Sequence, residues 1–170
     1  MVTGSKDTSI NVYTLDGRKI RSLRGHEAAI CCLGTIKTQH CELLASGSDN
    51  GCGSVILWDS RNWQMVSRIQ AHEAAVTSIV DLEDGKHIAT GSYDKKINII
   101  SLARNQKLHT LSNRASVTGM VMTSDKARLV TAGLDKSISI WTIIRKNGVY
   151  FHLCRSLKPL SRKKLSLVKS

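Results

Sequence analysis

Residues 88–101 read IATGSYDKKINIIS, and this stretch decides the fold because its pattern occurs four times along the chain. The other copies are MVTGSKDTSINVYT at 1–14, LASGSDNGCGSVILWD at 44–59 and LVTAGLDKSISIWT at 129–142. Each copy has an apolar start, then Thr or Ser, a small residue, a turn with Asp, an apolar alternation and a large residue. The Thr or Ser positions are Thr3, Ser46, Thr90 and Thr131, which are 43, 44 and 41 residues apart. Such a period indicates a repeat architecture.

A second pattern precedes the last three copies. It reads GHEAAICCL at 25–33, AHEAAVTSIV at 71–80 and NRASVTGMVM at 113–122. Gly25-His26 and Ala71-His72 align with Ser112-Asn113, so Asn113 stands where the other two repeats have His.

The third repeat shows how many strands each unit holds. Alternating apolar side chains predict strands at 76–80, 87–92 and 96–102, and a plausible fourth at 106–111. Asp84-Gly85 and Asp94-Lys95 supply turn residues between them. Four short antiparallel strands per roughly 40–45 residues are typical of one blade of a propeller.

With these motifs the chain resembles the WD-repeat family of β-propellers. The resemblance rests on Gly25-His26, LASGS at 44–48, Trp58-Asp59, Ala71-His72, IATGSYD at 88–94 and LVTAGLD at 129–135 through Trp141. It implies an all-β partial propeller of about four four-stranded antiparallel blades over residues 1–155. The blades are expected at about 1–24, 25–70, 71–111 and 112–155, followed by a basic flexible tail at 156–170.

The first blade is expected to lack its inner strand. Met1 aligns with Leu44, Ile88 and Leu129, at the start of the second strand of a blade. Residues 19–23 supply its outer strand, and residues 149–156 can supply the outer strand of the fourth blade. The chain is then a fragment of a larger propeller, one of two copies that complete a ring, or a chain completed by another protein. We favour the fragment.

His, Ser or Thr, and Asp recur in each repeat, but a catalytic triad is not the favoured interpretation. The sequence has no G-x-S-x-G elbow, and an enzyme needs one site rather than one in every blade. The resemblance implies structural hydrogen-bond tetrads, in which the loop His bridges the turn Asp and the strand Ser or Thr, and Trp closes the chain. The tetrad residues are His26, Ser46, Asp49 (or Asn50) and Trp58; His72, Thr90 and Asp94; and Thr131, Asp135 and Trp141. Ile100 replaces Trp in the third blade, and the first blade keeps Thr3 and Asp7 with Tyr13 for Trp.

Function is then expected to come from surfaces. In the family, the residue before each turn Asp often faces the narrow end of the ring, where peptides dock. These positions are Lys6, Ser48, Tyr93 and Leu134. Tyr93 is an amphipathic anchor of the kind found at hot spots, although an ordinary turn residue explains it too.

The composition suits a globular protein of the cytosol or nucleus. Of its 170 residues 41% are apolar, no stretch is long enough to span a membrane, and no secretory signal precedes the first repeat. The five cysteines are Cys31, Cys32, Cys41, Cys52 and Cys154. Their spacing matches no zinc motif, so we expect free thiols, no metal and no cofactor.

Positive charge gathers at the C-terminal end. The net charge is +12, and nine Lys or Arg residues follow the last acidic residue, Asp135. The candidate anion-binding residues of the tail are Arg155, Lys158, Arg162, Lys163, Lys164 and Lys169. The tail contains no aromatic residue on which a base could stack, and a solvated end explains it equally well.

The sequence therefore predicts a non-catalytic scaffold that binds other proteins or peptides. The alternative is a basic propeller that contacts RNA or DNA within a ribonucleoprotein or chromatin assembly. Strong salt dependence of binding would distinguish the alternative, because phosphate contacts release counterions.

Overall fold

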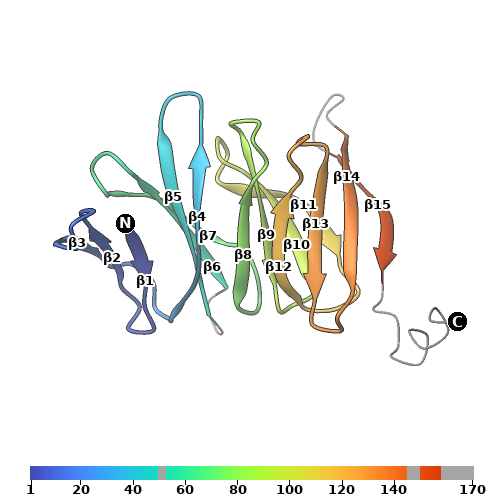
Figure 1. Cartoon of the computed structure of the whole chain (residues 1–170), viewed down its shortest axis with the longest axis horizontal. Helices are drawn as coiled ribbons and strands as arrows, with labels where there is room; N and C mark the ends of the chain where they lie inside the picture. The colour runs from blue at the N-terminus through green and yellow to red at the C-terminus, as the bar shows by residue number, and fades with distance from the viewer. Residues whose placement is uncertain (50–52, 145–149, 158–170) are drawn as a thin grey trace, which may run out of the picture.

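The computed structural model describes residues 1–49, 53–144 and 150–157. These residues form fifteen strands in four antiparallel sheets, which stand side by side as blades (Figure 1). The expected all-β partial propeller is thereby confirmed. None of the described segments forms a helix with the length and apolar character needed to cross a membrane.

The first sheet has three strands and the others have four. The first sheet consists of β1 (Val2–Gly4), β2 (Ile10–Tyr13) and β3 (Lys19–Leu23). The second consists of β4 (Ile30–Lys37), β5 (Glu42–Ser48), β6 (Ser54–Asp59) and β7 (Met65–Gln70). The third consists of β8 (Val76–Asp81), β9 (His87–Ser92), β10 (Lys96–Ser101) and β11 (Gln106–Ser112). The fourth consists of β12 (Val117–Met122), β13 (Arg128–Gly133), β14 (Ile138–Ile144) and β15 (Tyr150–Leu157).

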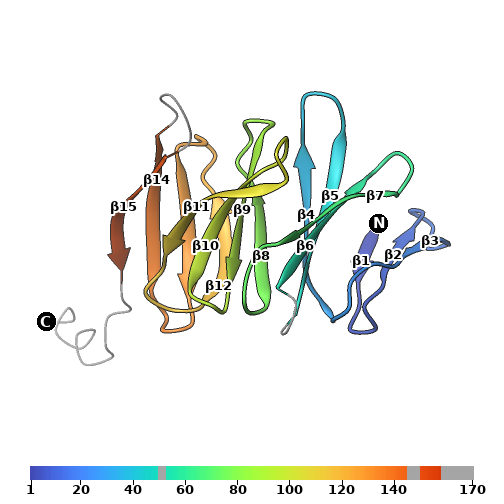
Figure 2. The same ribbon diagram turned by 180° about the vertical axis from the view of Figure 1, so that it is seen from behind.

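The sheets follow one another in chain order, with the first and fourth at opposite ends of the row (Figure 2). The inner strands β4 and β8 contact each other, as do β8 and β12, and β1 contacts β4. The first sheet has three strands where each of the others has four, which is consistent with the expected incomplete first blade. One detail differs from the prediction: β15 runs through Leu157, so the strand includes the first two residues assigned to the tail. Residues 158–170 lie outside the described part of the chain, and the flexible tail stays a prediction.

A short-range hydrogen bond to an aspartate stabilises the β1–β2, β9–β10 and β13–β14 turns. In three blades the turn Asp accepts a hydrogen bond from the backbone N–H two residues later, at 2.9 Å for Asp7, 2.8 Å for Asp94 and 3.1 Å for Asp135. The residue between them has a positive φ, as for Lys95 at 65° and Lys136 at 64°. The side-chain acceptor stabilises this tight turn where no glycine is present.

The core lies between neighbouring sheets rather than at one centre. Val55 and Leu57 of the second sheet pack in one cluster with Ile88 and Ile100 of the third. Equivalent clusters join the third sheet to the fourth and the first to the second. Full burial of each such side chain stabilises the fold by roughly 1.5–3 kcal/mol. Each blade is therefore held mainly by its neighbours.

Three glycines at one repeat position set how closely the blades approach. A Cβ on Gly4 would lie 2.5 Å from Ile30 Cγ2, and a Cβ on Gly91 would lie 2.6 Å from Val117 Cγ1. At Gly47 a Cβ would meet Val76 Cβ of the third sheet at 2.8 Å. A larger residue at any of these positions must displace the inner strand of the next blade.

Replacement of Gly91 tests this packing. We expect Gly91→Ala to lower the free energy of unfolding by about 1–3 kcal/mol, because its Cβ overlaps Val117 in the core. Gly119→Ala is the matched control, since a Cβ there has no heavy atom within 4 Å. Urea unfolding of both variants decides the point, and equal stability of the two would contradict the close-approach explanation.

Candidate functional site

A buried histidine links the loop before the third blade to its strands. The His72 side chain is fully covered; its Nδ1 lies 2.9 Å from Asp94 Oδ2 and its Nε2 lies 2.9 Å from Thr90 Oγ1. Asn98 fills the space on the strand side, where its Nδ2 donates to the Ala71 carbonyl at 2.7 Å. Thr110 donates to Asn98 Oδ1 at 2.6 Å, so the network reaches the outer strand β11.

The second blade builds a similar network with one different member. His26 Nε2 lies 2.7 Å from Ser46 Oγ, and Trp58 Nε1 donates to the same hydroxyl at 2.9 Å. At Nδ1, however, the structure places the hydroxyl of Ser54 at 3.3 Å. Ser54 opens the third strand, after a turn with two extra residues. The alternative turn residue, Asn50, lies outside the described residues.

The fourth and first blades keep only parts of the network. Trp141 Nε1 donates to Thr131 Oγ1 at 3.3 Å. Asn113, in place of His, donates to the Ala115 carbonyl at 2.8 Å, while its buried Oδ1 meets no hydrogen-bond partner among the described residues. Asp7 of the first blade accepts a bond from the Ser9 hydroxyl at 2.6 Å, but Thr3 is exposed.

Sequence reasoning missed Asn98 and Ser54. Both lie in strands whose sequences were interpreted as alternating apolar residues. A polar residue within such a strand could have pointed to them. Asn98 occupies the repeat position of Asn11, Ile56 and Ser139, so a polar residue in three of the four repeats was a signal in the sequence.

Burial keeps both histidines neutral. It lowers the pKa of His26 to about 4 from an ordinary value of 6.5, and the charge of Arg68 adds to this effect. It also lowers the pKa of His72, more strongly than Asp94 raises it. For Asp94 burial opposes ionisation, yet hydrogen bonds and the nearby imidazole lower its pKa. Each neutral ring can therefore donate at one nitrogen and accept at the other.

The strand hydroxyls that contact the histidines are enclosed, and Thr110, the exposed hydroxyl of the third-blade network, is bonded to Asn98 rather than to a histidine. Ser46 and Thr90 have no exposed surface. A groove of about 290 Å³ runs beside His72 and Asp94, but Thr90 does not line it. A substrate would have to reach a hydroxyl that the blades enclose, so the arrangement suits structure rather than group transfer.

We use the name loop face for one edge of the blades. It is formed by the β1–β2, β9–β10 and β13–β14 turns, by Asp49 and Gly53 next to β5 and β6, and by the β3–β4, β7–β8 and β11–β12 loops. It lies along the lower side of Figure 1. Of the four predicted surface residues, Lys6 is exposed, Tyr93 is 48% exposed and Leu134 is 66% exposed. The prediction that Ser48 is a surface residue is wrong. Ser48 is fully buried, and its hydroxyl lies 3.1 Å from Ser54 Oγ. The longer turn of this blade explains the difference, since Ser48 still belongs to β5.

Tyr93 and Leu134 are positioned by one loop. The Ser116 hydroxyl donates to the Tyr93 carbonyl at 2.8 Å, and the Leu134 N–H donates to the Ser116 carbonyl at 2.9 Å. The turns of the third and fourth blades are thus both tied to the β11–β12 loop. Two exposed apolar side chains therefore sit on a hydrogen-bonded frame.

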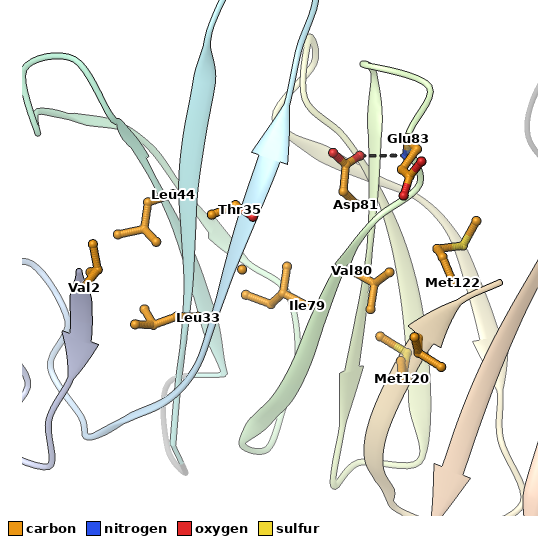
Figure 3. A pocket seen from close by; sticks show the side chains of 12 residues that line it. Val2, Leu33, Thr35, Leu44, Ile79, Val80, Asp81, Glu83, Met120 and Met122 are labelled. Carbon is orange, nitrogen blue, oxygen red and sulfur yellow. Dashed lines mark hydrogen bonds between the residues drawn. The ribbon is translucent and has the colours of Figure 1, made fainter. Parts of the chain in front are cut away.

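A separate groove of about 640 Å³ follows the inner strands. Figure 3 shows Leu33, Ile79, Val80 and Met120 along it, with Asp81 toward one end. Asp81 accepts hydrogen bonds from the backbone N–H groups of Lys37 and Glu83, at 2.8 Å each, and Glu83 pairs with Lys126 at 2.9 Å. These acidic groups are engaged within the fold. Among the described residues, no three His, Cys, Asp or Glu side chains gather as a metal site.

The predicted anion-binding residues fall almost wholly outside this description. Arg155 lies in β15, and the other five lie in residues 158–170, outside the described part of the chain. Their role stays a prediction.

Comparison with known proteins agrees with the four-blade architecture. The family described as "WD domain, G-beta repeat" matches residues 17–59, 63–101 and 105–142. The chain belongs to this family. The three matched repeats cover well over half of its length, and each supplies most of one four-stranded sheet.

Curated WD-repeat relatives are similar over part of their length. The chain is 31% identical over 108 residues to the p21-activated protein kinase-interacting protein 1-like of Gallus gallus, covering 62% of this chain and 28% of that protein. It is 30% identical over 113 residues to the COMPASS component SWD3 of Saccharomyces cerevisiae, covering 66% and 35%. It is 27% identical over 124 residues to the protein transport protein SEC13 of Coccidioides immitis, covering 65% and 40%. The chain thus spans less than half of each of these relatives.

Removal of the Thr90 hydroxyl tests the contribution of the third-blade network. We expect Thr90→Val to lower the free energy of unfolding by about 1–3 kcal/mol, because His72 Nε2 is left buried without its partner. Thr3→Val changes the same repeat position where it is exposed and should stay within about 0.5 kcal/mol of the parent. Chemical unfolding at neutral pH compares the two, and a neutral Thr90→Val would argue against the network.

Acid should weaken the fold through the buried histidines. Unfolded His26 takes up a proton near pH 6.5, whereas folded His26 does so only near pH 4, so stability is present above pH 6.5 and is lost as the pH falls toward 4. The loss from His26 is of the order of 3 kcal/mol. Unfolding curves across this range should show a smaller pH slope for His26→Gln than for the parent protein. Parallel slopes for the two proteins would refute the assignment.

Proposed function

We propose that this chain acts as a non-catalytic protein-interaction scaffold and that its loop face binds a segment of another protein. The observation that carries the proposal is the pair of exposed apolar side chains, Tyr93 and Leu134, held on adjacent turns by Ser116. Aromatic and aliphatic groups on a rigid frame lose little conformational entropy on binding.

The charge near this pair suggests the chemistry of the partner. Lys6, Lys95, Arg114 and Lys136 are exposed on the same loop face. The aspartates of these turns, by contrast, already accept backbone hydrogen bonds from within the turn. The exposed Glu27 and Glu73 of the same loop face pair with Arg68 and Lys96. A peptide with an apolar anchor and flanking acidic residues would complement this surface.

The relatives point in the same direction. By their printed names, one relative interacts with a protein kinase and another is a component of a larger complex. The chain matches only part of each of them, so the class of partner is our proposal for this chain. We also propose a cytosolic or nuclear role for this chain.

An immobilised peptide array probed with the full 170-residue protein tests the loop face. We expect Tyr93→Ala combined with Leu134→Ala to weaken binding of acidic peptides with an apolar anchor by about tenfold or more. Leu15→Ala is the control, because Leu15 is 99% exposed in the β2–β3 turn, away from the loop face. Peptides bound equally by all three proteins would place the interaction elsewhere.

The same protein preparations distinguish the nucleic-acid alternative. Binding to a single-stranded RNA that falls steeply between 50 and 200 mM salt, on the order of 10³-fold or more, would favour it. Loss of that binding on deletion of residues 158–170, with loop-face variants unaffected, would assign it to the basic tail.

A further inference from the structure

The last sheet has an apolar outer face with no neighbour among the described residues. Val121, Val130 and Ile140 lie opposite one another on β12, β13 and β14, and Ala132 pairs with Ile138 on the same face. We call these five residues the end face. Val121 is 59% exposed and Ile138 is 44% exposed, and a hollow of about 190 Å³ lies among them.

The repeat positions of Val130, Ile138 and Ile140 are completely covered in the preceding blades. In the second sheet they are Ala45, Val55 and Leu57, and in the third sheet they are Ala89, Ile97 and Ile99; all six have no exposed surface. A contiguous apolar patch that is buried at every internal junction marks an interaction surface where it is left open.

Each internal junction also shows what covers such a face. The facing side of the next sheet supplies aliphatic or Trp side chains from its second and third strands, as Ile88 and Ile100 do for the second sheet and Leu129 and Trp141 do for the third. In the first sheet the corresponding positions are Met1, which is 65% exposed, and Tyr13, which is half-buried. The two halves of one blade junction therefore lie at opposite ends of the row of sheets (Figures 1 and 2).

We propose that the end face binds the first sheet of a second copy of this chain, head to tail, and that two copies close into a ring. This is the two-copy alternative of the sequence analysis, in place of the fragment favoured there. Each copy contributes four sheets, so two copies give eight. Closed propellers have about four to eight blades, and a third copy would exceed that range. A head-to-tail contact closes a ring when its rotation is matched by the number of copies.

Ala132 favours a second copy over an ordinary complete blade. At the first three junctions this position is glycine, and its missing Cβ makes room for Ile30, Val76 or Val117 on the inner strand of the next blade. Ala132 would collide with a β-branched residue placed there. The first sheet of this chain has three strands and presents no inner strand at that point, so the alanine fits.

This inference goes beyond the proposed function, because it uses neither Tyr93 nor Leu134. Its test is the mass in solution, measured by light scattering on a size-exclusion column over a range of concentrations. We expect a concentration-dependent species of twice the 18.7 kDa chain mass. Leu15→Lys, at a 99% exposed turn residue, is the control and should still form this species.

Two variants, each altered at one end, identify the contact. Ile138→Lys alters the end face and Thr3→Arg alters the exposed side of the first sheet. Each variant alone should be a monomer, because every contact in the ring needs both surfaces. An equimolar mixture should recover a dimer, since the intact end face of Thr3→Arg meets the intact first sheet of Ile138→Lys. Recovery also shows that both variants are folded.

Several results would overturn the proposal. These are a wild-type protein that stays monomeric at every concentration, an Ile138→Lys variant that still dimerises, and a Thr3→Arg variant that dimerises alone through two end faces. A ladder of species larger than two copies, abolished by both variants, would overturn ring closure.

Discussion

The structure depends on the contact between apolar sheet faces. Each sheet has an apolar face on either side, and a single sheet cannot bury its own faces. Val55 and Leu57 are buried only because Ile88 and Ile100 stand against them, and Ile97 and Ile99 only because Leu129 and Trp141 do. The stability of each sheet therefore depends on its neighbours, as in other repeat proteins. The outer faces of the first and last sheets have exposed apolar side chains, whereas the equivalent faces inside the row are buried.

The polar networks are a consequence of this packing. Sheets that close upon each other also enclose His26 and His72, which must then find partners for both ring nitrogens. Where the repeat keeps the histidine, hydroxyl groups contact the ring, and His72 also contacts the carboxylate of Asp94 and the amide of Asn98. Where Asn113 replaces it, one buried oxygen is left without a partner among the described residues. The networks therefore differ from blade to blade.

The groups available for binding lie on the surface, because the polar networks around the histidines are buried. Ser46 and Thr90 lie beside histidines, as the hydroxyl of a hydrolytic site does. Both are fully buried, however, and their hydrogen bonds stabilise the fold. The exposed groups stand on turns that the same hydrogen bonds fix in place. A rigid frame with Tyr93 and Leu134 on it is suited to recognition, and the exposed outer face of the last sheet is suited to assembly.

The sequence by itself determined the repeat, the number of blades and the position of most strands, because alternation and turn residues act locally. The β9 strand, His87–Ser92, agrees with the prediction at both ends. It also pointed to His72, Thr90 and Asp94, since a four-fold repeat reveals equivalent positions. Only the tertiary structure decided that Ser54 and Asn98 join the histidines, that Ser48 is buried, and that Ser116 holds two turns at once. These are contacts between strands and loops up to 28 residues apart, and no local pattern specifies which side chain reaches across.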